Sequence, residues 1–272
     1  MTRNWISTSI NKIIKLLILT TLLWSCEEKI VVNLANDNPL VVIESYISNS
    51  VNPIVVKITR SQAFFNQSAF VPVKNATVQI ESLTITEKMV EAGAGFYLSN
   101  RLQGKSGRSY SLKVTSGTSS FGASVTLPYP VPIDTVYFAT ALFQKDSLNA
   151  IVEFRDPAVT ENYYRIKLYY NGRYAVNDYF LATDAFSDGQ KIVAPIYYHN
   201  FAPGDTVIVE LLNVERNTWR YFKALSESIQ HGFNSQAPGN PPTNITGGAL
   251  GIFGAYGSSQ RRLIVPRPLG GK

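Results

Sequence analysis

Cysteine and histidine are almost absent from this chain of 272 residues, which contains one cysteine and two histidines. Metal sites built from several histidines are therefore excluded, and no H-E-x-x-H sequence occurs. Neither His199 nor His231 accompanies a G-x-S-x-G sequence, in which serine would be the nucleophile. The composition favours a protein that is not an enzyme, and it predicts no metal and no cofactor.

Charged residues are also scarce, at 16% of the chain. Three of the basic residues, Arg3, Lys12 and Lys15, lie within residues 1–25, which contain no acidic residue. Without this segment the 25 basic residues fall to 22 against 19 acidic ones, and the net charge falls from +6 to +3. No block of Lys and Arg remains, so we expect no nucleic-acid partner.

The chain has no apolar run long enough to span a bilayer, which takes about 20 residues. Its most apolar run, residues 16–24, has nine residues after a basic start, as in a signal peptide. The sequence that follows, Leu23-Trp24-Ser25-Cys26, resembles a bacterial lipobox. We therefore expect residues 1–25 to be removed and Cys26 to carry acyl chains. The alternative is an ordinary secretory leader that leaves Cys26 as a stray thiol, which is a liability in an oxidising compartment.

Two glutamates, Glu27 and Glu28, follow the cysteine directly. They resemble the acidic signal that sends Bacteroidota lipoproteins to the outer leaflet of the outer membrane, and they could equally begin a solvated tether. Residues 26–37 are interpreted as this tether. The expected location is the outer membrane, with the protein facing outward.

Apolar residues alternate with polar ones along most of the remaining chain, the pattern of strands with one buried face. Tyr110, Leu112 and Val114 share one face of a segment, opposite Ser111 and Lys113. Turn residues such as Asn-Gly and Asp-Gly separate the segments. The pattern predicts an all-β fold.

Three alternating prolines in residues 128–132 predict an extended connector between two β-sandwich domains. The first, residues 38–127, resembles an immunoglobulin-like or transthyretin-like sandwich. The second is a larger sandwich of residues 133–268, and residues 269–272 form a tail.

One segment has helical spacing instead, with Trp219, Phe222 and Ile229 on one face. It predicts a helix over about 218–230, capped by Asn217 or Thr218. We expect this helix to cover the open end of a sandwich, with partner binding as the alternative.

Several sequence blocks together resemble a known family. In order, they are PLVVIESYIS, VKITRSQAFFN, VPVKNATVQI, GRSYSLKV, IDTVYF, VEFRDPAVTENYYRIKL, DGQKI, GDTVIVELLNVERNTWRYFKAL and NPPTNITGGALGIFGAYG. The resemblance is to the Bacteroidota outer-membrane lipoprotein family catalogued as domain of unknown function 4249. It implies an accessory subunit of a TonB-dependent outer-membrane transporter and supplies no catalytic residues. The alternative is a free-standing surface adhesin or a lipoprotein that binds a glycan or another ligand.

The last of these blocks is the most specific, and it is rich in glycine. Glycines there permit turns and the close approach of another backbone. The block is either structural or a partner contact. Its candidate residues are Asn244, Gly247, Gly248, Gly251 and Gly254.

Two further patterns have simpler explanations in local structure. Asp178, Asp184 and Asp188 could bind calcium, but their spacing is not that of an EF-hand and Asp188-Gly189 is an ordinary turn pair. Thr135, Ser147 and Thr206 each follow Asp and precede an apolar residue, which resembles an O-glycosylation pattern of Bacteroidota. The same tripeptides are also common at the start of a strand.

Overall fold

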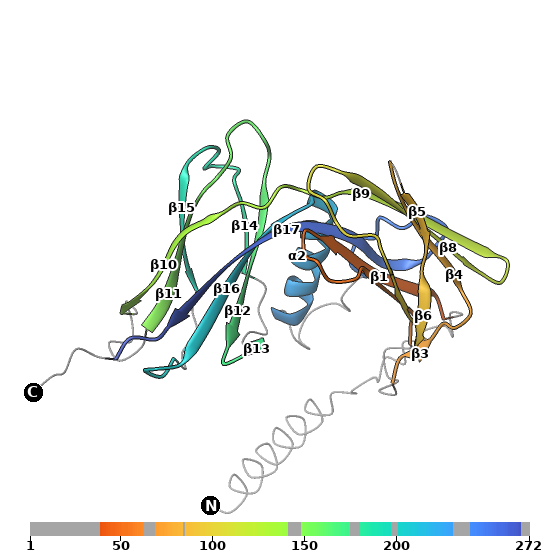
Figure 1. Cartoon of the computed structure of the whole chain (residues 1–272), viewed down its shortest axis with the longest axis horizontal. Coiled ribbons are helices and arrows are strands. Elements are labelled where there is room, and N and C mark those ends of the chain that lie inside the picture. The colour runs from red at the N-terminus through yellow and green to blue at the C-terminus, as the bar shows by residue number, and fades with distance from the viewer. Residues whose placement is uncertain are drawn as a thin grey trace, which may run out of the picture. The chain divides into compact units, whose positions relative to one another are not determined.

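The computed structural model describes residues 39–62, 69–83, 85–140, 148–174, 180–196, 201–230 and 240–267. Residues Asn38–Lys272 form one compact unit of the chain. Strands dominate this unit, with one helix in its described part (Figure 1). The expected all-β fold is confirmed.

The largest sheet, sheet A, runs through the whole unit. Its order is β13 (Arg173–Tyr174), β12 (Tyr163–Tyr170), β16 (Thr206–Val214), β17 (Leu250–Ile264), β1 (Val41–Ser48), β2 (Val55–Arg60), β7 (Phe96–Leu98) and β6 (Val90–Gly93). Two short strands also pair with it, β14 (Phe180–Thr183) with β12 and β3 (Val71–Pro72) with β2.

Two smaller sheets pack against sheet A. Sheet B has the order β5 (Ile85–Lys88), β4 (Thr77–Ser82), β8 (Ser109–Ser116) and β9 (Ser119–Thr126). Sheet C has the order β10 (Ile133–Thr140), β11 (Leu148–Arg155) and β15 (Lys191–Ile196). The two sandwiches that result each enclose a hydrophobic core.

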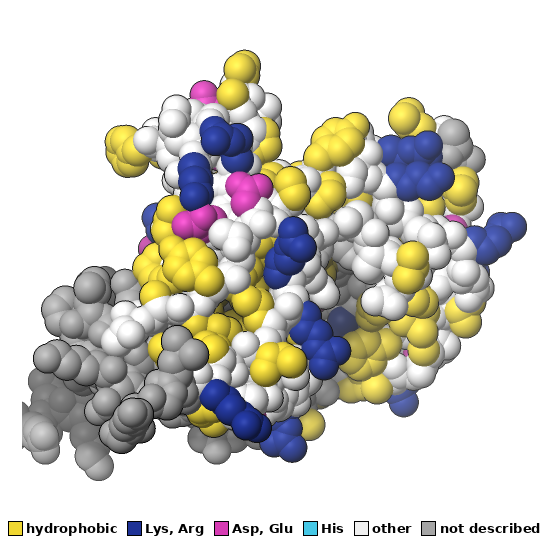
Figure 2. Space-filling model, turned by 60° about the vertical axis from the view of Figure 1, so that its left-hand side comes forward, with side chains coloured by type: hydrophobic (Ala, Val, Ile, Leu, Met, Phe, Trp, Pro, Cys, Tyr) yellow, Lys and Arg dark blue, Asp and Glu magenta, His cyan; other side chains and the backbone are white. Residues whose placement is uncertain are grey.

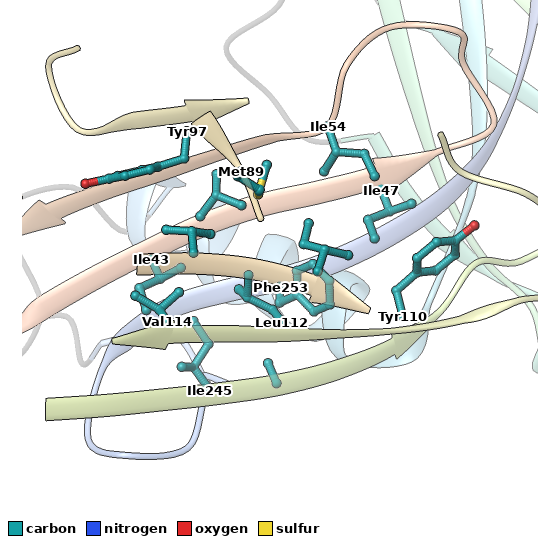
Figure 3. Packing of buried hydrophobic residues seen from close by; sticks show 14 of the residues in the cluster. Ile43, Ile47, Ile54, Met89, Tyr97, Tyr110, Leu112, Val114, Ile245 and Phe253 are labelled. Carbon is teal, nitrogen blue, oxygen red and sulfur yellow. The ribbon is translucent and has the colours of Figure 1, made fainter. Parts of the chain in front are cut away.

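The first core lies between sheet B and one end of sheet A. Alternation along the strands supplies it, because every second side chain points inward, as with Tyr110, Leu112 and Val114 of β8. Figure 3 shows Ile245 and Phe253, from the end of the chain, lying among residues such as Ile43 of β1. The second core lies between sheet C and the other end of sheet A, around Phe154 and Tyr164.

Strand β17 belongs to both sandwiches. It pairs in parallel with β1 from Leu250 to Tyr256 and antiparallel with β16 from Tyr256 to Ile264. The expected division at 128–132 assigns the whole of this strand to the second sandwich, and that assignment is wrong for its first half. Its partner β1 lies about 200 residues away in the sequence, so no local pattern indicates the pairing.

The helix α2 (Arg216–Gln230) begins two residues before the expected start at 218. Glu215 caps it in place of the expected Asn217 or Thr218, accepting the N–H groups of Asn217 at 2.9 Å and Thr218 at 3.1 Å. The Thr218 side chain is buried and accepts the N–H of Ala255 instead. Fixing this residue against β17 leaves the neighbouring glutamate to cap.

Helix α2 packs on the face of sheet A opposite the two cores, rather than over the open end of a sandwich. Phe222 stacks on Tyr46 of β1, with ring centroids 5.6 Å apart, and Trp219 packs on Tyr163 of β12 at 5.3 Å. Tyr221 is buried too, whereas Ile229 of the expected apolar stripe is exposed. The helix therefore bridges strands of both sandwiches.

One carboxylate is buried in the first sandwich. Glu87 of β5 accepts the N–H groups of Asn100, Arg101 and Leu102, the last at 2.6 Å. Burial by itself raises the pKa of this carboxyl, but these hydrogen bonds outweigh it and hold the pKa below its ordinary value of 4.5. The ionised form of Glu87 thus stabilises the loop at 100–102.

Candidate functional site

The glycine-rich block begins with a loop fixed by Asn244. The side chain of this residue accepts the N–H of Phe253 at 3.0 Å and donates to its carbonyl oxygen at 2.8 Å. Between them the chain turns through Gly247, Gly248 and Gly251, whose φ angles of +91°, +85° and +97° favour glycine. The loop thereby returns the chain into β17.

Three glycines of β17 allow other parts of the chain to approach closely. A Cβ at Gly251 would lie 2.1 Å from the carbonyl oxygen of Ile43, and one at Gly254 would lie 2.7 Å from the hydroxyl of Thr218. A Cβ at Gly257 would lie 2.5 Å from the nitrogen of Pro130 in the connector. These internal contacts account for the glycines structurally, and a partner contact at the block stays a prediction.

A groove of about 400 Å³ lies where the connector passes the start of α2. We call it the connector groove. One wall is apolar and comes from connector residues 128–131, including the largely exposed ring of Tyr129. The other wall carries Glu161, Tyr163, Glu215 and Arg216. An aromatic ring facing carboxylates and a guanidinium suits a ligand with both apolar and hydroxyl or amine groups.

The polar wall of the connector groove holds one tightly paired phenol. Tyr163 donates a hydrogen bond to Glu161. Burial, followed by this hydrogen bond, raises the pKa of Tyr163 to about 12, although Arg216 acts in the opposite direction. The phenol therefore keeps its proton at neutral pH and serves as a donor.

Asn162 links the groove to a cluster of three carboxylates. Its amide group receives a hydrogen bond from Asn213 at 3.3 Å on the groove side, and its N–H donates to Asp184 at 2.7 Å. One carboxylate oxygen of each of Asp156, Asp184 and Asp188 lies within 4.8 Å of the others. These oxygens are the residues here that could hold a hard cation such as calcium.

The cluster differs from the calcium hypothesis drawn from the sequence. Asp184 and Asp188 are in it, Asp178 lies outside the described residues, and Asp156 is the member that sequence reasoning missed. Hydrogen bonds already occupy much of the cluster, since Asp156 accepts from Tyr164 and from the N–H of Gly189. Asp188 likewise accepts the N–H of Val159 at 2.8 Å, as expected of a turn residue.

The other residues singled out in the sequence do not join this site. Thr135 is exposed on β10 and Thr206 begins β16, where its N–H donates to Asn171. Ser147 lies outside the described residues, as do Cys26, Glu27 and Glu28. Glycosylation, lipidation and export therefore stay predictions.

Charged side chains are thinly spread over the surface. The face drawn in Figure 2 shows Lys and Arg side chains singly or in small groups, with few Asp or Glu between them. Such a face provides little long-range steering by charge. In the described part of the chain, no helix has the length and apolar character needed to cross a membrane.

Comparisons with known proteins give one family. A model of the family described as "Domain of unknown function (DUF4249)" matches residues 27–262. No curated protein matches significantly. Among solved structures, a segment of two fibronectin type III domains from chicken tenascin is 12% identical, covering 65% of this chain and 91% of that chain, with a TM-score of 0.21. A score this low carries no argument about fold or function.

Proposed function

The chain belongs to the family of the domain of unknown function DUF4249, and on this basis we propose that it is an outer-membrane lipoprotein of Bacteroidota. It acts there as a non-catalytic accessory subunit of a TonB-dependent transporter. Acyl chains on Cys26 anchor it, and the folded unit faces outward.

The observation that carries this proposal is the position of the only cysteine. Cys26 directly follows a short apolar run with a basic start, and Glu27 and Glu28 come next. The family match begins at residue 27, directly after the cysteine. A leader that ends at the cysteine, followed by the family domain, is the order expected of a lipoprotein. Several acyl chains on one residue give a stable membrane anchor.

The non-catalytic part of the proposal is supported by the residue types available. The chain has two histidines, and both lie outside the described residues. In the described part, the clustered carboxylates and the phenol of Tyr163 are held by hydrogen bonds within the chain. These groups stabilise loops and are not poised as acid and base.

The test is affinity purification of the tagged protein from mildly solubilised outer membranes, followed by mass spectrometry. We expect the mature protein to carry acyl chains on Cys26 and to recover one transporter in near-stoichiometric amount. Cys26→Ser should leave the protein folded and abolish its membrane association. Recovery of the acylated protein alone in several mild detergents would contradict the accessory role, and recovery without acyl chains would contradict the anchor.

A free-standing ligand-binding lipoprotein is the second candidate, and the connector groove favours it. The exposed ring of Tyr129 and the polar groups opposite it match the chemistry of a sugar, which stacks on aromatic rings and bonds to carboxylates. Binding to a glycan array that is lost in Tyr129→Ala would support this function. Binding that persists in Tyr129→Ala would place the site elsewhere.

A further inference from the structure

Helix α2 covers the outer face of sheet A over only part of its width. The helix packs on β12, β17 and β1, where Phe222 stacks on Tyr46. In Figure 1, β3 and β6 lie away from it, at the far end of the same sheet. The outer face of β2, β7 and β6 is therefore not covered by the helix.

Apolar side chains occupy this uncovered part. Register places Val55, Leu98 and Val90 side by side on β2, β7 and β6, and it places Phe96 beside Lys57. Neighbouring residues such as Val56 and Tyr97 point the other way, into the first core. The exposed members, which we call the open face, are Leu40, Val55, Phe70, Val90 and Phe96, with Phe70 65% and Val90 52% exposed.

The open face lies where the described chain begins. Leu40 and Ser61 exchange hydrogen bonds of 2.8 and 2.9 Å, which fix the first described residues to the end of β2. Twelve residues, 27–38, separate them from Cys26. A chain of that length spans at most about 40 Å. A surface held so near its target meets it at an effective concentration of about millimolar, so a weak contact is enough to populate the docked state.

The charges beside the open face suit a lipid surface. Lys57 lies over the ring of Phe70 at 5.4 Å and pairs with Glu44 at 3.4 Å, so its stem covers apolar surface while its charge stays neutralised. Arg60 is exposed and donates to the carbonyl oxygen of Pro39. Phe, Leu and Val with a basic residue at the edge are typical of interfacial contacts, whereas protein interfaces are enriched in Tyr, Trp and Arg.

We propose that the open face rests on the lipid–water interface of the membrane that holds Cys26. The contact orients the first sandwich, with the outer face of β2, β7 and β6 toward the lipid. This inference rests on the lipid anchor of the proposed function and adds an orientation to it.

The test uses the acylated mature protein in vesicles of phosphatidylethanolamine and phosphatidylglycerol. Acylation leaves no free thiol, because Cys26 is the only cysteine. Phe70→Cys then gives a single site for a polarity-sensitive fluorophore. The matched control is Leu83→Cys, an equally accessible position at the turn after β4, on the other sheet of the same sandwich. Both positions are exposed, so labelling leaves the core intact.

We expect brominated phospholipid to quench the label at position 70 at least about threefold more than the label at position 83, since interfacial groups lie within 5–10 Å of the acyl boundary. Aqueous iodide should show the reverse order. Equal quenching of the two labels would overturn the inference and leave the anchor standing. Wild-type protein that fails to float with the vesicles would overturn both. Protection of position 70 that appears only when a transporter is added, without lipid quenching, would assign the open face to a protein and overturn the inference.

Discussion

The substitution Gly251→Ala is expected to be severely destabilising. Gly251 has φ +97°, a conformation that costs a residue with a side chain about 1–3 kcal/mol. The new methyl group would also lie 2.1 Å from the carbonyl oxygen of Ile43, which belongs to the backbone of central strand β1 and cannot rotate away. Displacing β1 disturbs its ladder with β17, so the total cost should exceed about 4 kcal/mol.

A matched control separates the two contributions. Gly248 has φ +85°, and a Cβ there would meet no atom within 4 Å. Gly248→Ala should therefore cost only the backbone term of about 1–3 kcal/mol. Urea unfolding of the mature protein measures both, followed by the fluorescence of Trp219, since the other two tryptophans lie in residues 1–25.

The comparison can refute the reasoning in two ways. Equal unfolding free energies for the two variants would show that β1 and β17 do not approach as described. Wild-type stability in Gly251→Ala, combined with loss of a copurifying transporter, would establish the glycine block as a partner contact. Severe destabilisation of Gly251→Ala alone supports the structural role.

Three further substitutions address single hydrogen-bonded residues. Because the pKa of Glu87 is lowered on folding, its contribution is fully present above pH 4.5 and is lost as the pH falls through the lowered value. Glu87→Gln should thus unfold more easily at pH 7, by about 1–3 kcal/mol, and show a weaker dependence on acid, whereas parallel pH profiles would contradict this account. Asn244→Ala removes both bonds to Phe253 and should also cost about 1–3 kcal/mol in urea unfolding, and a cost below about 0.5 would show the loop to be held otherwise. Glu215→Ala removes the cap of α2 and should cost about 1 kcal/mol, against almost nothing for Glu227→Ala, whose exposed ion pair with Lys223 contributes little; equal costs would rule out the cap.

Local patterns predicted the elements of the fold and failed at contacts between distant segments. The alternation of Tyr110, Leu112 and Val114 predicted a strand face that is indeed buried, because each strand reports its own core. The parallel pairing of β1 with β17 leaves no such trace, since either neighbour would suit an apolar strand. Glycines at 251, 254 and 257 were the available signal, and they indicated close approach without naming what approaches.

The candidate site shows the same limit. The turn at Asp188 was readable from its glycine, yet the carboxylate cluster also needs Asp156, which lies 28 residues before Asp184 on a different strand end. The connector groove joins residues 128–131 to the start of α2, and its two walls are separated by more than 80 residues. Spacing in the sequence cannot report a distance across such an interval.

The long strand β17 gives the protein a mechanical property that matters for the proposed function. Its 15 residues extend about 50 Å and form the ladder of both sandwiches. Helix α2 and the connector close upon the same strand at Gly254 and Gly257, so the junction is braced on two sides. A hinge between the sandwiches would have to break the β1–β17 or the β16–β17 ladder. The two sandwiches therefore move as one body. If the open face orients the first sandwich on the membrane, the second sandwich and the connector groove are held in a fixed position above it.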